Sequence, residues 1–242
     1  MGELMDFAHE YDLHVIEDAC EAIGAEFKGK KTGTFGDLGV FGFYPNKQIT
    51  TGEGGMIVTD DEKIAGLCKS CRNQGRDSNG WLEHSRLGYN YRLSDINCAL
   101  GIAQLGRIDE MLEKRSRVAS RYNHLLNGIV RIPEALDGSK RSWFVYVVCL
   151  PDQYSKEERD KILIELSNRG IGCSNYFPPI HLQPFYREQF GYTSGNYTVT
   201  EHISERTIAL PFHNNLKEEE IKYVEDSLKE ILTQISWNST LG

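Results

Sequence analysis

The sequence has no apolar run close to the roughly 20 residues that a membrane-spanning helix needs. Its first residues, "MGELMDFAHEYD", are acidic and lack the basic-then-apolar order of a signal peptide. These two absences argue against a membrane protein and predict a cytoplasmic location.

Positive charge is scarce as well. The formal net charge is −8 at pH 7 and the isoelectric point is near 5.4. A broad nucleic-acid or membrane-surface footprint would require a basic field. We therefore expect neither kind of partner, and any bound phosphate must be met by a local cluster or by backbone amides.

The six cysteines lack the spacing of a disulfide scaffold, so we expect reduced, mostly buried thiols. Cys68 and Cys71 form a lone C-x-x-C with no second pair and no nearby histidines, which favours a structural role, and no metal site is predicted. The stretch "GAEFKGKK" nearly spells a phosphate loop, but Lys31 stands where a hydroxyl is needed, which favours a hairpin.

The 242 residues are enough for one large domain or two ordinary ones. Residues 3–12 read as a helix, and residues 13–19 as a strand whose apolar run stops at Glu17 and Asp18. Two buried strands are predicted at 38–44 and 54–59. Such a mixture indicates an α/β sheet, in which ligands bind beyond the strand ends.

The second half mixes helices with strands. A long helix is expected from Ser94, bent near Gly106, and the spacing of Ser155 and Glu158 is that of a capping box. Strands are predicted at 142–150 and 170–176. The last helix carries an apolar stripe of Ile221, Val224, Leu228, Ile231 and Ile235.

One lysine has an unusual setting. In "FGFYPNKQITTGEGG", Lys47 stands between an apolar run ending in a proline turn and a loop with three glycines. Most lysines are exposed surface charges. At the end of a buried strand, however, a lysine is placed to be desolvated, which lowers its pKa and frees the amine as a nucleophile. The reaction that most needs this is Schiff-base formation.

A Schiff-base lysine that serves pyridoxal phosphate needs a carboxylate to keep the pyridine nitrogen protonated. Asp18, at the end of the first strand, is a candidate for that role. An acid at a strand end is more often a helix cap or a surface residue. Paired with Lys47 at a neighbouring strand end, it gains a specific function.

Longer stretches along the chain resemble a known family: "VIEDACEAIGAEFKGKKTGTFGDLGVFGFYPNKQITTGEGGMIVTDDEKI", "RNQGR", "GYNYRLSDINCALGIAQL" and "YFPPIHLQPFYRE". They are similar to the DegT/DnrJ group of sugar aminotransferases, which are fold-type-I enzymes that use pyridoxal phosphate. The resemblance covers essentially the whole chain. It implies transfer of an amino group, usually from glutamate, to a nucleotide-linked keto-deoxysugar in polysaccharide or glycan biosynthesis.

The resemblance also implies roles for single residues. Lys47 matches the Schiff-base lysine, Asp18 its pyridinium partner, and Glu21 a position near the cofactor's hydroxyl face. Many members carry serine where this chain has Gly42, so that phosphate contact must come from other groups or be weaker. Asn90, with Arg92 as companion, matches a residue that reaches the pyridoxal phosphate of the neighbouring subunit, which implies a homodimer with shared active sites. His181 corresponds to a position that contacts the sugar or its phosphates.

By the same resemblance, residues 1–125 form the C-terminal part of the large α/β cofactor-binding domain with the connecting helix, and residues 126–242 form a smaller α+β domain. The family's upstream elements, which cup the phosphate and stack on the cofactor, have no match here. The alternative to an active aminotransferase is thus a catalytically incomplete fragment, either a dimerisation or regulatory module or a chain that needs a separate N-terminal partner. A sugar-dehydrating branch has histidine in place of the lysine, so Lys47 argues against it.

Overall fold

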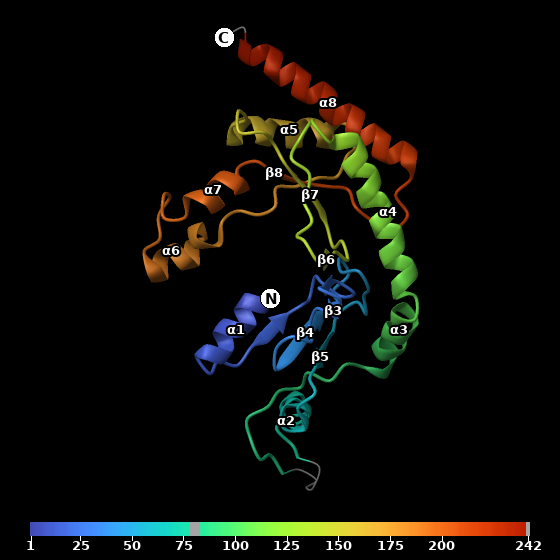
Figure 1. The fold of residues 1–242 in the computed structure, drawn as a ribbon, viewed down its shortest axis with the longest axis vertical. Coiled ribbons are helices and arrows are strands. Elements are labelled where there is room, and N and C mark those ends of the chain that lie inside the picture. Colours follow the sequence, from blue (N-terminus) through green and yellow to red (C-terminus); the bar gives the residue numbers. More distant parts are fainter. Residues whose placement is uncertain (78–82, 241–242) are drawn as a thin grey trace. The chain divides into compact units, whose positions relative to one another are not determined.

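The computed structural model describes residues 1–77 and 83–240 (Figure 1). The chain forms two compact units. The first unit comprises Met1–Glu113 with Ala135–Phe144, and the second comprises Lys114–Glu134 with Val145–Gly242. The domain division at residue 125, which the resemblance implied, stays a prediction.

The sheet that carries the site lies in the first unit. It has the order β1-β4-β5, with strands Ile16–Asp18, Leu38–Gly42 and Gly55–Val58. Strands β1 and β4 are parallel, with Asp18 opposite Val40, while β5 runs antiparallel to β4. Because parallel strands end at the same edge, Asp18 and the chain that follows Gly42 lie together. The predicted α/β character is confirmed.

The expectation that the strands at 38–44 and 54–59 are buried was wrong for the second and holds only in part for the first. Strand β4 is half-buried, whereas in β5 Met56 is 51% exposed and Ile57 48%. Within residues 1–77 and 83–240, no other side chain fully covers the exposed apolar side chains of this sheet. Apolar composition predicted strands correctly, but it could not show which faces are covered.

The predicted hairpin is present as β2 (Glu26–Phe27) and β3 (Lys30–Lys31), paired antiparallel. A third strand, β6 (Ser139–Lys140), pairs with β2. That strand comes from far along the chain and had no local signal in the sequence. It brings the following residues, up to Phe144, into the first unit.

The helices of the first unit follow their sequence signals. Helix α1 spans Gly2–Glu10, and α2 spans Glu62–Arg72 behind an Asp61 cap. The long helix expected from Ser94 is divided at Gly106 into α3 (Asp95–Leu105) and α4 (Ile108–Leu126), and α4 belongs to the second unit from Lys114 onward. Ser94 is the N-cap of α3, as its sequence position predicted. All six cysteines are free, and all are half-buried rather than mostly buried.

The second unit is built on two antiparallel strands, β7 (Tyr146–Cys149) and β8 (Thr207–Leu210). The strand expected at 170–176 is wrong, since that segment makes only a single bridge, from Ser174 to Ala209. Gly170, with φ of 76°, follows the C-cap Arg169 and ends helix α5 instead of beginning a strand. Strand β8 was not predicted.

Helices complete the second unit: α5 (Lys156–Asn168), α6 (Pro184–Phe190), α7 (Thr198–Ser204), α8 (Glu218–Thr240) and the short 3-10 helix Ile180–Leu182. The capping box at the start of α5 is present. The predicted stripe of α8 is buried from Ile221 to Ile231, whereas Ile235 is half-buried. This stripe contributes to the core of the unit, together with Tyr122, Tyr146, Leu150, Ile162 and Leu166.

Candidate active site

The loop that presents Lys47 is held by its own backbone. Lys47 N–H donates to the Tyr44 carbonyl at 2.9 Å, and Thr51 N–H donates to the Phe43 carbonyl at 3.0 Å. Gly54 closes the loop with φ of 146°, and a Cβ there would lie 2.6 Å from Thr51 Oγ1. Only glycine fits that position, so the glycine-rich sequence fixes the loop.

Lys47 lines an open cavity of about 290 Å³ together with Asp18, Cys20, Glu21 and Ala22. Its side chain is 15% exposed. The amine Nζ lies 2.8 Å from Glu21 Oε1 and 4.5 Å from the centre of the Phe144 ring. The amine is therefore largely shielded from water and faces both a carboxylate and an aromatic ring.

Asp18 lines the same cavity and is held by Cys20. The Cys20 backbone N–H donates to Asp18 Oδ1 at 3.1 Å. Hydrogen bonds from the Cys20 thiol and N–H, with the charge of Lys47, hold the pKa of Asp18 below its ordinary value. Burial, and the hydrogen bond to Asp18, raise the pKa of the Cys20 thiol to about 11. At neutral pH, Asp18 is thus an anion beside a protonated thiol.

Glu17, the neighbouring carboxylate, has a different task. It accepts hydrogen bonds from the backbone N–H groups of Gly33, Phe35 and Gly36. Successive side chains of a strand point to opposite faces, so Glu17 holds this turn while Asp18 faces the cavity.

Gly42 lies beside the same group of residues. A Cβ added there would stand 3.3 Å from Cys20 Cβ and 3.8 Å from Lys47 Cε. A side chain at position 42 would therefore lie against both Cys20 and Lys47. The contact that the resemblance assigns to a serine at this position stays a prediction.

Asn90 and Arg92 lie elsewhere in the first unit. Asn90 forms a single β-bridge with Asn73, and Arg92 donates from Nη1 to Asn73 Oδ1 at 2.9 Å. Both are exposed. Neither is among the residues that line the Lys47 cavity of the same chain. Their assignment to the neighbouring subunit's cofactor stays a prediction.

His181 belongs to the second unit and is 7% exposed. Its Nε2 lies 3.0 Å from Glu201 Oε1, and its ring packs against Tyr197 at 4.8 Å between centroids. Glu201 also accepts from Ser194 Oγ and Gly195 N–H, and these bonds, with the one from His181, lower its pKa to about 2. The substrate contact that the resemblance implied for His181 stays a prediction.

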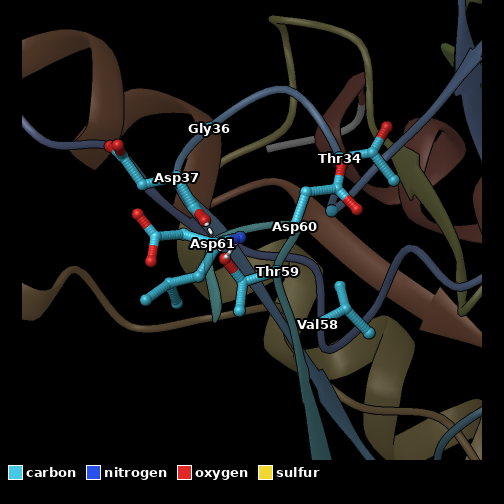
Figure 2. Close-up of a pocket in the computed structure, with 9 residues that line it drawn as sticks. Thr34, Gly36, Asp37, Val58, Thr59, Asp60 and Asp61 are labelled. Atoms are coloured by element: carbon cyan, nitrogen blue, oxygen red, sulfur yellow. Dashed lines mark hydrogen bonds between the residues drawn. The ribbon is translucent and has the colours of Figure 1, made fainter. Parts of the chain in front are cut away.

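A second hollow, of about 310 Å³, lies at the opposite, amino end of β4. Figure 2 shows Asp37, Asp60 and Asp61 around it. Asp37 accepts from Val15 N–H at 2.7 Å, and Asp61 caps α2 by accepting from the N–H groups of Lys63 and Ile64. Two of the three carboxylates that line this hollow, Asp37 and Asp61, therefore accept hydrogen bonds from the backbone.

The structure also bears on metal binding and on membrane insertion. Within residues 1–77 and 83–240, no group of three or more His, Cys, Asp or Glu side chains is arranged to hold a metal ion. In that same part of the chain, no helix combines the length and the apolarity that crossing a bilayer requires.

The sequence did not point to three residues that contact the site: Cys20, which binds Asp18; Gln48, which binds the backbone of Glu21; and Phe144, whose ring lies beside the Lys47 amine. Cys20 could have been found, because an Asp whose oxygen accepts from the N–H two residues later is a common local turn. Gln48 and Phe144 act through contacts between distant segments, for which a single sequence carries no signal.

A model of the DegT/DnrJ/EryC1/StrS aminotransferase family matches residues 1–229. The uncharacterized protein MJ1066 of Methanocaldococcus jannaschii is 38% identical over 247 residues, covering 97% of this chain and 64% of that protein. The GDP-perosamine synthase of Caulobacter vibrioides is 37% identical over 236 residues, covering 96% of this chain and 62% of that protein.

Solved structures give the same result. PseC of Helicobacter pylori, an aminotransferase involved in the biosynthesis of pseudoaminic acid, superposes with a TM-score of 0.89 at 27% identity, over 95% of this chain and 62% of that one. The PLP-form of the putative sugar aminotransferase Spr1654 of Streptococcus pneumoniae gives 0.87 at 25% identity, over 95% and 60%. The predicted fold-type-I α/β architecture is confirmed. The chain spans less than two thirds of the length of these relatives.

Proposed function

Because the chain belongs to the DegT/DnrJ/EryC1/StrS aminotransferase family, we propose that it carries the lysine and carboxylate side of a pyridoxal-phosphate-dependent sugar aminotransferase site. One observation supports this above the others. Lys47, from the loop after β4, lines one cavity of the first unit together with Asp18 and Glu21, which come from the end of β1 and the turn after it.

The residues present fit pyridoxal phosphate. The cavity offers a shielded amine at Lys47 and, on the same wall, an anionic Asp18 held by Cys20. When bound, the cofactor supplies an aldehyde for a lysine amine and a ring that withdraws electrons when its nitrogen is protonated. Lys47 is the residue that would hold the aldehyde, and Asp18 the one that would keep the ring nitrogen protonated.

The chain's own groups would then divide the work of transamination. Asp18 keeps its negative charge at neutral pH because Cys20 donates hydrogen bonds to it. Lys47, once its amine is free, can take up or return a proton at Nζ. Glu21 lies within hydrogen-bond distance of that amine, with Oε1 2.8 Å from Nζ, and can accept a hydrogen bond from it.

The substrate class is proposed from the relatives. Their names include GDP-perosamine synthase, a UDP-4-amino-4,6-dideoxy-N-acetyl-beta-L-altrosamine transaminase and a spore coat polysaccharide biosynthesis protein. We infer that this site takes an amino group from glutamate and gives it to a nucleotide-linked keto-deoxysugar for glycan synthesis in the cytoplasm. His181 is proposed to contact that sugar or its phosphates.

A homodimer with shared sites belongs to the same proposal, with Asn90 and Arg92 reaching the cofactor phosphate of the neighbouring copy. The non-enzymatic alternative, a dimerisation or regulatory module, would not require Lys47, Asp18 and Glu21 to line one cavity. Their clustering favours the enzyme.

Reduction with borohydride in the presence of pyridoxal phosphate tests the proposal directly. We expect one pyridoxyl group per chain, mapped by peptide mass to Lys47, and none on a Lys47→Arg variant. Labelling spread over exposed lysines such as Lys28 and Lys63 would overturn the assignment. Amination of GDP- and UDP-linked keto sugars with glutamate as donor then tests the substrate class.

A further inference from the structure

A buried amide stands next to the reactive lysine. The Gln48 side chain is 3% exposed. Its Nε2 donates one hydrogen bond to the Glu21 carbonyl at 2.7 Å and another to Ser142 Oγ at 3.0 Å. A glutamine amide has two N–H donors, so both are used.

These two bonds join the segments that surround the Lys47 amine. One anchors the backbone of Glu21, whose carboxylate lies 2.8 Å from Nζ. The other anchors Ser142, two residues before Phe144, whose ring centre lies 4.5 Å from Nζ. Three parts of the chain that are far apart in sequence therefore meet at one side chain.

We propose that Gln48 is a positioning residue, which holds Glu21 and Phe144 against the Lys47 amine. The role rests on the proposed function, since it gives the amine a fixed proton partner. The Glu21 side chain is 50% exposed. A half-exposed side chain loses conformational freedom when it is held in one place, and anchoring its backbone lowers that cost.

A packing role alone does not account for glutamine here. Among the described residues, Gln48 Oε1 has no hydrogen-bond partner although the side chain is buried. A side chain that only filled this space would be apolar, because a buried oxygen without a partner is unfavourable. Glutamine is explained instead by the two hydrogen bonds that its Nε2 donates, to the Glu21 carbonyl and to Ser142 Oγ.

Trace acylation of the 242-residue chain with acetic anhydride tests the inference without any cofactor. The rate at Lys47 is compared with that at exposed Lys63 across a pH series, by peptide mass. The variant Gln48→Met keeps the volume but removes both donors. We expect Lys47 to be acylated roughly threefold or more faster in this variant, which corresponds to losing one ion pair of modest strength, and its pH profile to approach that of Lys63.

The matched control is Gln104→Met. Gln104 Oε1 accepts from Thr50 N–H at 3.0 Å, so it also binds the lysine loop, but it touches neither Glu21 nor Ser142 through that bond. We expect the Lys47 profile of this variant to equal that of the unchanged chain. Equal Lys47 profiles for Gln48→Met and the unchanged chain, or an equal change in Gln104→Met, would overturn the inference.

A second variant covers the case in which Gln48→Met does not fold. If Gln48→Met fails to fold by circular dichroism, Ser142→Ala decides, because it removes one acceptor and leaves the loop unchanged. A smaller acceleration at Lys47 is expected there, and none would overturn the inference. Failure of the proposed function is distinguishable, since a chain that binds no pyridoxal phosphate can still show the difference in acylation.

Discussion

The two ends of strand β4 each open into a hollow of similar size that contains carboxylates. At the amino end, Asp37 and Asp61 accept hydrogen bonds from backbone N–H groups. At the carboxyl end, Asp18 shares a cavity with the Lys47 amine. Volume and acidity are therefore poor guides to chemistry. What distinguishes the carboxyl end is that an acid and a shielded amine, which can exchange protons with a ligand, face the same space.

Removing the amine is the most severe test of this difference. Lys47→Ala is expected to abolish both the borohydride-reducible adduct and transamination, because no other described residue that lines the cavity carries an amine. Turnover is measured with glutamate and a nucleotide-linked keto sugar. Lys63→Ala serves as the control and should keep full activity. Persisting turnover in Lys47→Ala would refute the role of the carboxyl end.

The carboxylates at the two ends can be compared directly. Asp18→Asn should keep the fold and reduce the transamination rate by on the order of 100-fold, since an amide cannot carry the negative charge. Asp37→Asn, the matched change at the amino end, should leave that rate unchanged. The rates are measured at saturating substrates on folded protein. Similar losses in both variants would remove the distinction between the ends.

The amino end should show its effect in stability instead. Asp61→Ala removes the cap of α2, and loss of such a cap costs about 1 kcal/mol in the free energy of unfolding. Urea unfolding measures this loss. The amount of pyridoxyl adduct on Lys47 should stay the same, and a reduced adduct in a stably folded Asp61→Ala chain would argue that the amino end takes part in cofactor binding.

A carboxylate of the second unit gives the smallest expected effect. The pKa of Glu201 is lowered to about 2 from its ordinary 4.5. Its hydrogen bonds therefore add stability that is complete above pH 4.5 and is lost as the pH falls towards 2. The difference in urea stability between the unchanged chain and Glu201→Gln should shrink over that interval. A constant difference would show that Glu201 is not held as an anion.

The sequence alone predicted the α/β character, the αβ unit ending in two acids and the lysine loop. It chose Asp18 over Glu17 from its place at the strand end and from the resemblance, but it could not show that Glu17 instead binds the backbone of residues 33–36. It placed a strand at 170–176, where the chain makes only one bridge, from Ser174 to Ala209, and the partner of β7 is instead Thr207–Leu210. Gln48 and Phe144 could not be identified from the sequence, because their contacts with the site join segments that lie far apart along the chain.

The raised pKa of the Cys20 thiol has a practical consequence. Alkylating reagents and oxidants attack the thiolate, and a thiol that ionises only near pH 11 is almost entirely protonated in a cell. The cavity therefore contains a sulfur atom that resists alkylation and oxidation beside the Lys47 amine. Covalent inhibitors of this site should carry carbonyl warheads directed at Lys47, and thiol-directed ones should fail.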